Sequence, residues 1–158
     1  MLEYELNDSY KLMFEERSIP IYTYNIETLL AEKLETVMAR GTANTRMRNF
    51  YDIYVILEQE KDSIVIENLQ KAFLATSQKR DTVHVIPRFY EILDEINQSE
   101  LMERDWNNLK NNSFFVGDLI WQDVLISTSK LAELTIDTQK MTMQSEEEEQ
   151  EEFGMAMV

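Results

Sequence analysis

The chain contains no cysteine, one histidine and three glycines among its 158 residues. Without cysteine it can form neither a disulfide framework nor a thiolate metal site. The single histidine, His84, excludes a zinc site built from several histidines and argues against a histidine-based catalytic triad. Gly41, Gly117 and Gly154 stand apart from one another, so the chain has no glycine-rich loop of the kind that cradles a phosphate.

Long hydrophobic runs are also missing. No apolar segment approaches the roughly 20 residues that a membrane-spanning helix requires. The first ten residues, MLEYELNDSY, lack the basic and apolar regions of a signal peptide. We therefore expect a soluble protein of the cytoplasm that makes no membrane contact.

Acidic residues are abundant and unevenly distributed. The net charge of the chain is -15. Residues 136–158 contain seven acids and one lysine, so this tail has a net charge of -6 and the rest of the chain has a net charge of -9. A tail with so many glutamates is too polar to pack, and we predict that it is disordered. The acidic body disfavours a broad nucleic-acid surface, so any RNA contact would need a local basic patch.

Two segments near the N-terminus, residues 2–6 and 19–24, alternate apolar and polar side chains as strands do. Residues 10–14 could form a third short strand or irregular chain. Two or three such strands are not stable alone. They resemble one edge of a larger sheet, or they pair with another chain, and such an exposed edge would favour a dimer.

From residue 26 onward the apolar spacing is helical. The expected helices cover residues 26–40, 46–60 and 64–78 and then begin near Pro87, after Ser99 and after Asp118. The predicted fold class is therefore α+β and mostly α. A helical bundle (26–135) would carry a small N-terminal β appendage (1–25) and the acidic tail (136–158).

Two smaller patterns remain. Residues 82–86, which include His84, have the alternation of a short strand, and we interpret His84 as an ordinary strand residue. Four aromatic residues could surround a cofactor, but core packing is the favoured interpretation of their spacing. These are Trp106, Phe114, Phe115 and Trp121.

Lys33 is the unusual residue of the first expected helix. It falls on the apolar stripe, between Leu29, Leu30 and Val37, and Arg40 follows one heptad later. A lysine in this setting must extend to water, lose its proton or find an anion. It could pair with a structural carboxylate or contact an anionic ligand. We predict that Lys33 lies within ion-pair distance of Asp52 or of another carboxylate.

The next expected helix carries Arg46 and Arg48 in its first turn, where the helix dipole prefers acidic side chains. Residues 36–51 contain three arginines and no acid. Such an island suits a phosphate ligand. Arg48 and Asp52 are also spaced i,i+4 and could form an ion pair. The two interpretations are compatible.

Two runs in this region resemble the motifs of a known family. YNIETLLAEKLE (24–35), centred on Lys33, is similar to the lysine motif of the AbiEii/AbiGii nucleotidyltransferase toxins. RMRNFYDIY (46–54) is similar to their downstream aspartate motif. The similarity is dense over residues 17–57 and extends weakly, as helical similarity, to about residue 135. The chain resembles the C-terminal portion of these toxins, which belong to abortive-infection and toxin–antitoxin systems of phage defence.

The resemblance implies NTP-dependent transfer, with RNA as the acceptor, by in-line attack on the α-phosphate. It also implies that Lys33, Arg40, Arg46 and Arg48 approach the triphosphate and that Asp52 orients them. We take Lys33, Asp52 and Asn49 as candidate catalytic residues, although Asn49 stands where the family prefers aspartate.

In the family, a Gly-Ser loop and an Asp-x-Asp pair bind magnesium and the nucleotide, and neither motif occurs in this sequence. We therefore expect no metal or cofactor in this chain alone. Mg²⁺ and NTP would bind only if the missing half were supplied. One hypothesis is a nucleotidyltransferase portion that is inactive by itself. The other is a non-catalytic module that binds an antitoxin or a full-length relative.

Overall fold

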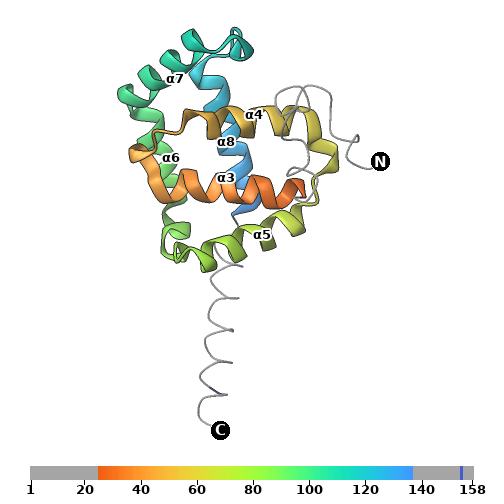
Figure 1. The fold of residues 1–158 in the computed structure, drawn as a ribbon. Helices are drawn as coiled ribbons and strands as arrows, with labels where there is room; N and C mark the ends of the chain where they lie inside the picture. The colour runs from red at the N-terminus through yellow and green to blue at the C-terminus, as the bar shows by residue number, and fades with distance from the viewer. Residues whose placement is uncertain (1–24, 137–153, 155–158) are drawn as a thin grey trace.

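The computed structural model describes residues 25–136 and Gly154 (Figure 1). Six α-helices of ten or more residues form the described part between residues 25 and 136. They are α3 (Ile26–Arg40), α4 (Met47–Glu60), α5 (Ile66–Lys79), α6 (Phe89–Gln98), α7 (Glu100–Asn112) and α8 (Trp121–Thr135). Four short 3-10 helices join them: η3 (Gly41–Ala43), η4 (Lys61–Ser63), η5 (Val83–Arg88) and η6 (Phe114–Val116).

The described residues contain no β-strand, so the predicted α+β class is wrong and the described fold is all-α. The helices bury their apolar stripes against one another and satisfy their backbone hydrogen bonds internally, so this part of the chain needs no sheet. The strands predicted at residues 2–6 and 19–24, together with the β appendage that they would form, lie outside the described residues. So does nearly all of the acidic tail (136–158).

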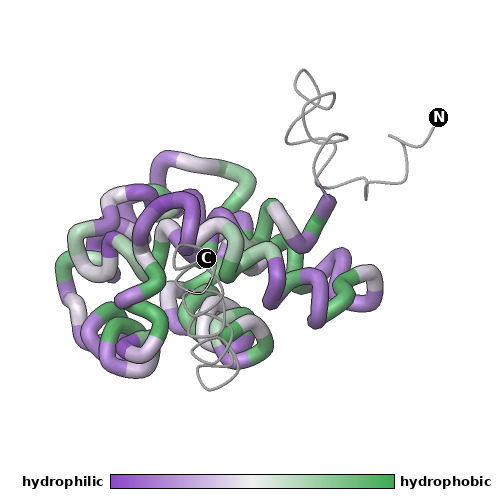
Figure 2. Tube along the Cα trace, turned by 90° about the horizontal axis from the view of Figure 1, so that it is seen from below, coloured by the Kyte–Doolittle hydropathy of each residue, from purple (hydrophilic) through white to green (hydrophobic). Residues whose placement is uncertain are grey.

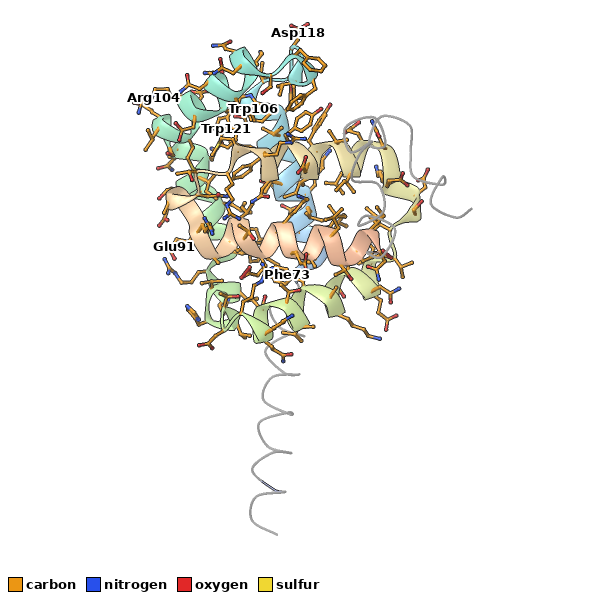
Figure 3. The ribbon with its side chains drawn as sticks, in the orientation of Figure 1. Phe73, Glu91, Arg104, Trp106, Asp118 and Trp121 are labelled. Atoms are coloured by element: carbon orange, nitrogen blue, oxygen red, sulfur yellow. The ribbon has the colours of Figure 1, made fainter. Side chains whose placement is uncertain are left out.

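The helix α3 lies at the centre of the fold. In Figure 1 it runs between α4 and α5, and α8 crosses behind all three. Leu30, Leu34 and Val37 of α3 are completely buried, as their spacing predicts. Hydrophobic and hydrophilic segments alternate along the helices in Figure 2. Phe73, buried on α5, lies between α3 and α5 in Figure 3. The lysine motif therefore sits on the most enclosed helix.

The predicted boundaries of α3 are confirmed. Asn25 caps its N-terminus by accepting a hydrogen bond of 2.7 Å from the backbone N–H of Thr28. The helix ends at Gly41, whose φ of 52° is a conformation that side chains disfavour. Ser99 caps α7, as expected, by accepting from the N–H of Met102. The chain turns between α3 and α4 at the position that the glycine indicates.

Residues 82–86 are not a strand. They lie mostly in η5, His84 is exposed, and Pro87 falls in this 3-10 helix, so α6 begins at Phe89. Alternation of apolar and polar residues over five positions does not distinguish a strand from a short 3-10 helix, in which neighbouring side chains also differ in burial. The last helix, expected directly after Asp118, begins at Trp121.

The aromatic residues separate into two groups. Trp106 and Trp121 are buried, with ring centroids 6.0 Å apart, and they lie close together in Figure 3. The indole N–H of Trp106 donates to the carbonyl of Leu119 at 3.2 Å. These contacts join α7 to α8, so core packing is confirmed for the two tryptophans. It is wrong for Phe114, which is 99% exposed.

Two acidic residues of α3 are buried rather than solvated. Glu35 is 3% exposed, accepts from Arg80 Nη1 at 2.8 Å and accepts from the Thr82 hydroxyl at 2.9 Å. Glu27 is 8% exposed and accepts from the backbone N–H of Val65. These two carboxylates are therefore covered by the residues at the two ends of α5. Among the described residues, no helix combines the length and apolar composition that crossing a bilayer requires.

Candidate phosphate-binding site

Lys33 and Asp52 form the ion pair that the stripe position of Lys33 predicts. Lys33 Nζ lies 2.9 Å from Asp52 Oδ2 and joins α3 to α4. The Lys33 side chain is 17% exposed and that of Asp52 is 6% exposed. A carboxylate at such depth requires a partner, because transferring an unpaired charge out of water is costly. The pair therefore gives the Asp52 carboxylate the counterion that its burial requires.

Arg48 contacts the same carboxylate from one helical turn earlier. Its Nε lies 3.4 Å from Asp52 Oδ1, which confirms the i,i+4 pair. Two cations thus share one carboxylate, and the three groups carry one net positive charge. Within the described part of the chain, the two terminal nitrogens of Arg48 have no hydrogen-bond partner. The side chain is 43% exposed, so these donors can reach a ligand.

The turn between α7 and α8 holds Arg48 in place. The Arg48 Cζ atom lies 4.6 Å from the centroid of the Phe115 ring, within the range of a cation–π contact. The Tyr51 hydroxyl donates to the Phe115 carbonyl at 3.1 Å. Burial raises the pKa of Tyr51 against an opposing effect of Arg48, so this hydroxyl remains protonated at neutral pH and keeps donating.

A pocket opens at the N-terminus of α4, with a volume of about 540 Å³. Residues 45–49 form one wall, and Asp105, Asn108 and Leu109 of α7 form the other. Arg46, Arg48 and Asn49 all line it. The candidate residues of the downstream motif therefore share one concave surface with α7.

The backbone of this helix end also suits an anion. Arg46 is the N-cap residue and its side chain makes no capping bond. The Asn44 side chain accepts from the Arg46 N–H at 2.9 Å, whereas the N–H groups of Met47 and Arg48 have no partner among the described residues. Free first-turn N–H groups and the positive end of the helix dipole favour a bound anion. Arg46 and Arg48 add formal charge at the same place.

The structure does not bring all the predicted residues into this pocket. Lys33 and Asp52 lie beside it, behind Arg48, and are not among its lining residues. Arg40 is exposed in the last turn of α3 and does not line the pocket either. The expected cluster is therefore divided: Arg46, Arg48 and Asn49 face the pocket, and the Lys33–Asp52 pair supports Arg48.

The described residues do not fit a magnesium site. Across residues 25–136 and Gly154, no three histidine, cysteine, aspartate or glutamate side chains gather closely enough to hold a metal ion. Asp52 is paired with two cations, and Asp105 is the only acid among the described residues that line the pocket. Magnesium requires oxygen ligands from carboxylates or phosphates. We therefore assign no magnesium ligand here.

Sequence reasoning missed the α7 wall of the pocket and the Phe115 contact. Asp105 and Asn108 come more than fifty positions after Arg48, and no local motif marks them. Their spacing with Leu109 places them on one helix face, but the spacing does not reveal what that face opposes.

Comparison with known proteins gives one match. The family model described as "Nucleotidyl transferase AbiEii toxin, Type IV TA system" matches residues 4–127. Neither the curated proteins nor the solved structures contain a match to the chain. The matched segment includes the Lys33–Asp52 pair, the arginines of α4 and the α7 wall of the pocket.

Proposed function

Because the chain belongs to the AbiEii family of nucleotidyltransferase toxins, we propose that it supplies the basic wall of a nucleoside triphosphate site. In this proposal Arg46 and Arg48 bind phosphate oxygens at the N-terminus of α4. One observation supports this proposal. Lys33 already pairs with Asp52, and the Arg48 side chain remains 43% exposed with its two terminal nitrogens available to a ligand. Arginine forks match phosphate oxygens in geometry as well as in charge.

Binding of inorganic tripolyphosphate tests this proposal directly. Arg46→Met should weaken binding about tenfold, because one charge-assisted contact contributes about 1.5 kcal/mol. Asp105→Asn should strengthen binding a few-fold, because it removes the acid that faces the arginines across the pocket. Isothermal titration calorimetry at low and at physiological salt measures both effects.

The matched control is Arg104→Met. Arg104 neighbours Asp105 in α7 but is exposed, lies at the outer edge of the molecule in Figure 3 and does not line the pocket. Removing its charge should change the affinity by less than twofold. If Arg104→Met and Arg46→Met weaken binding equally, the attraction comes from overall charge and the pocket assignment fails.

We further propose that transfer requires a second polypeptide segment. In the reaction that we propose, the oxygen of an RNA hydroxyl would bond to the α-phosphorus and release its proton to water. The bond between the α-phosphorus and the α–β bridging oxygen would break, and pyrophosphate would leave. The described residues provide no metal-binding carboxylate cluster for this step, and the sequence has neither a Gly-Ser loop nor an Asp-x-Asp pair. Lys33 and Asp52 then act by positioning Arg48, and Asn49 by donating a hydrogen bond.

A transfer assay with labelled NTPs, magnesium and total RNA checks this requirement. We expect no incorporation by the chain alone. Incorporation should appear when a segment bearing the two missing motifs is added, and Arg48→Met should reduce it. Incorporation by the chain alone, at a rate proportional to its concentration and lost in Arg48→Met, would overturn the proposal. An antitoxin is the partner that the type IV system implies.

A further inference from the structure

Phe114 is the most exposed large apolar residue of the described chain. Its side chain is 99% exposed, whereas Phe115 beside it is partly buried and Val116 is buried. A phenylalanine in water gains none of the free energy that burial of its ring would provide. The Phe114 side chain thus contributes little to the stability of the fold and is free to contact a ligand.

The turn that carries Phe114 is fixed to α4. Phe114 begins η6, in which the Val116 N–H donates to the Ser113 carbonyl at 3.2 Å. The Phe115 carbonyl accepts from the Tyr51 hydroxyl, and the two rings lie 5.3 Å apart. Gly117 follows with a φ of 62°, which lets the chain reverse toward α8. The exposed ring is therefore held on an ordered turn.

A short series of contacts connects Phe114 with the phosphate-binding arginines. The Phe114 and Phe115 rings meet edge to face with centroids 5.8 Å apart, and the Phe115 ring centroid also lies 4.6 Å from Arg48 Cζ. One aromatic ring thus separates the exposed ring from the guanidinium that lines the pocket. A nucleotide likewise carries its base and its phosphates on opposite sides of a ribose.

We propose that the Phe114 ring is a stacking surface for a nucleobase whose phosphates lie against Arg48 and Arg46. The inference rests on the proposed phosphate site and extends it to the base. An exposed aromatic ring beside a cationic groove is the arrangement that binds nucleotides by stacking, and it tolerates different bases because each has a π face. The nucleobase belongs either to the triphosphate or to an acceptor strand, and both sources present the same chemistry.

The experiment compares three ligands: tripolyphosphate, the four NTPs and a five-nucleotide single-stranded RNA. Phe114→Ala should weaken NTP binding about five- to tenfold and leave tripolyphosphate binding unchanged. Phe114→Trp should restore or strengthen binding, since it keeps the aromatic face. Tyr90→Ala is the matched control, because Tyr90 is a 65% exposed aromatic residue of α6 that does not line the pocket. It should change nothing.

The outcomes separate the two proposals. If Phe114→Ala weakens only the binding of the RNA, stacking is supported and the base belongs to the acceptor strand. If Phe114→Ala weakens the binding of all three ligands equally, or of none of them, the Phe114 assignment is wrong. The phosphate site would still stand as long as tripolyphosphate binding depends on Arg46. A variant that binds every ligand normally but loses self-association would identify Phe114 as a protein contact instead. If the unaltered chain binds none of the ligands, both proposals fail.

Discussion

Asp52→Ala should lower the free energy of unfolding by about 3 kcal/mol. The substitution leaves Lys33, only 17% exposed, without its counterion beside the fully buried Leu30 and Val37. It also frees Arg48, whose Nε bonds to the same carboxylate. Most of the loss is the cost of an unpaired ammonium rather than the attraction of the pair. Urea denaturation followed by circular dichroism measures it.

Two further variants distinguish this explanation from a general sensitivity to charge. Glu67→Ala breaks the exposed i,i+4 pair with Lys71 and should cost less than about 0.5 kcal/mol. Lys33→Met combined with Asp52→Leu removes both charges and should recover most of the stability lost in Asp52→Ala. A loss in Asp52→Ala no greater than in Glu67→Ala would show that Lys33 reaches water without Asp52.

The Lys33–Asp52 pair could be predicted from the sequence because its cause is local. Helical periodicity alone placed an ammonium among Leu29, Leu30 and Val37, and such a group must be neutralised. The next helix carries Asp52 one turn after Arg48, at the i,i+4 spacing of an ion pair. Both ion pairs occur in the structure. The roles of these residues in phosphate binding stay predictions until binding is measured.

The remaining features depend on contacts between distant parts of the chain. Glu35 is buried because Arg80 and Thr82 cover it from more than forty positions away along the chain. The pocket likewise exists only because α7 packs near the start of α4. Periodicity shows which face of a helix is apolar, but it does not show which partner a polar face meets.

The partner that holds α7 in this position is Trp106, and Trp106→Ala should lower the free energy of unfolding by about 4 kcal/mol. The side chain is completely buried. Its indole ring lies 6.0 Å from Trp121, whose ring in turn contacts Phe50 of α4 edge to face at 5.1 Å. The truncation therefore opens a cavity where α4, α7 and α8 meet. It also removes the hydrogen bond to Leu119.

Trp106→Phe separates these contributions. It keeps most of the packed volume and loses the indole N–H, so it should cost only about 1–2 kcal/mol. Leu101→Ala, at a 52% exposed position of the same helix, should cost less than about 0.5 kcal/mol. Because Asn108 and Leu109 follow Trp106 on α7 and line the pocket, Trp106→Ala should also weaken tripolyphosphate binding at temperatures where the variant remains folded. A stable variant with unchanged affinity would show that α7 is held against α4 by other contacts.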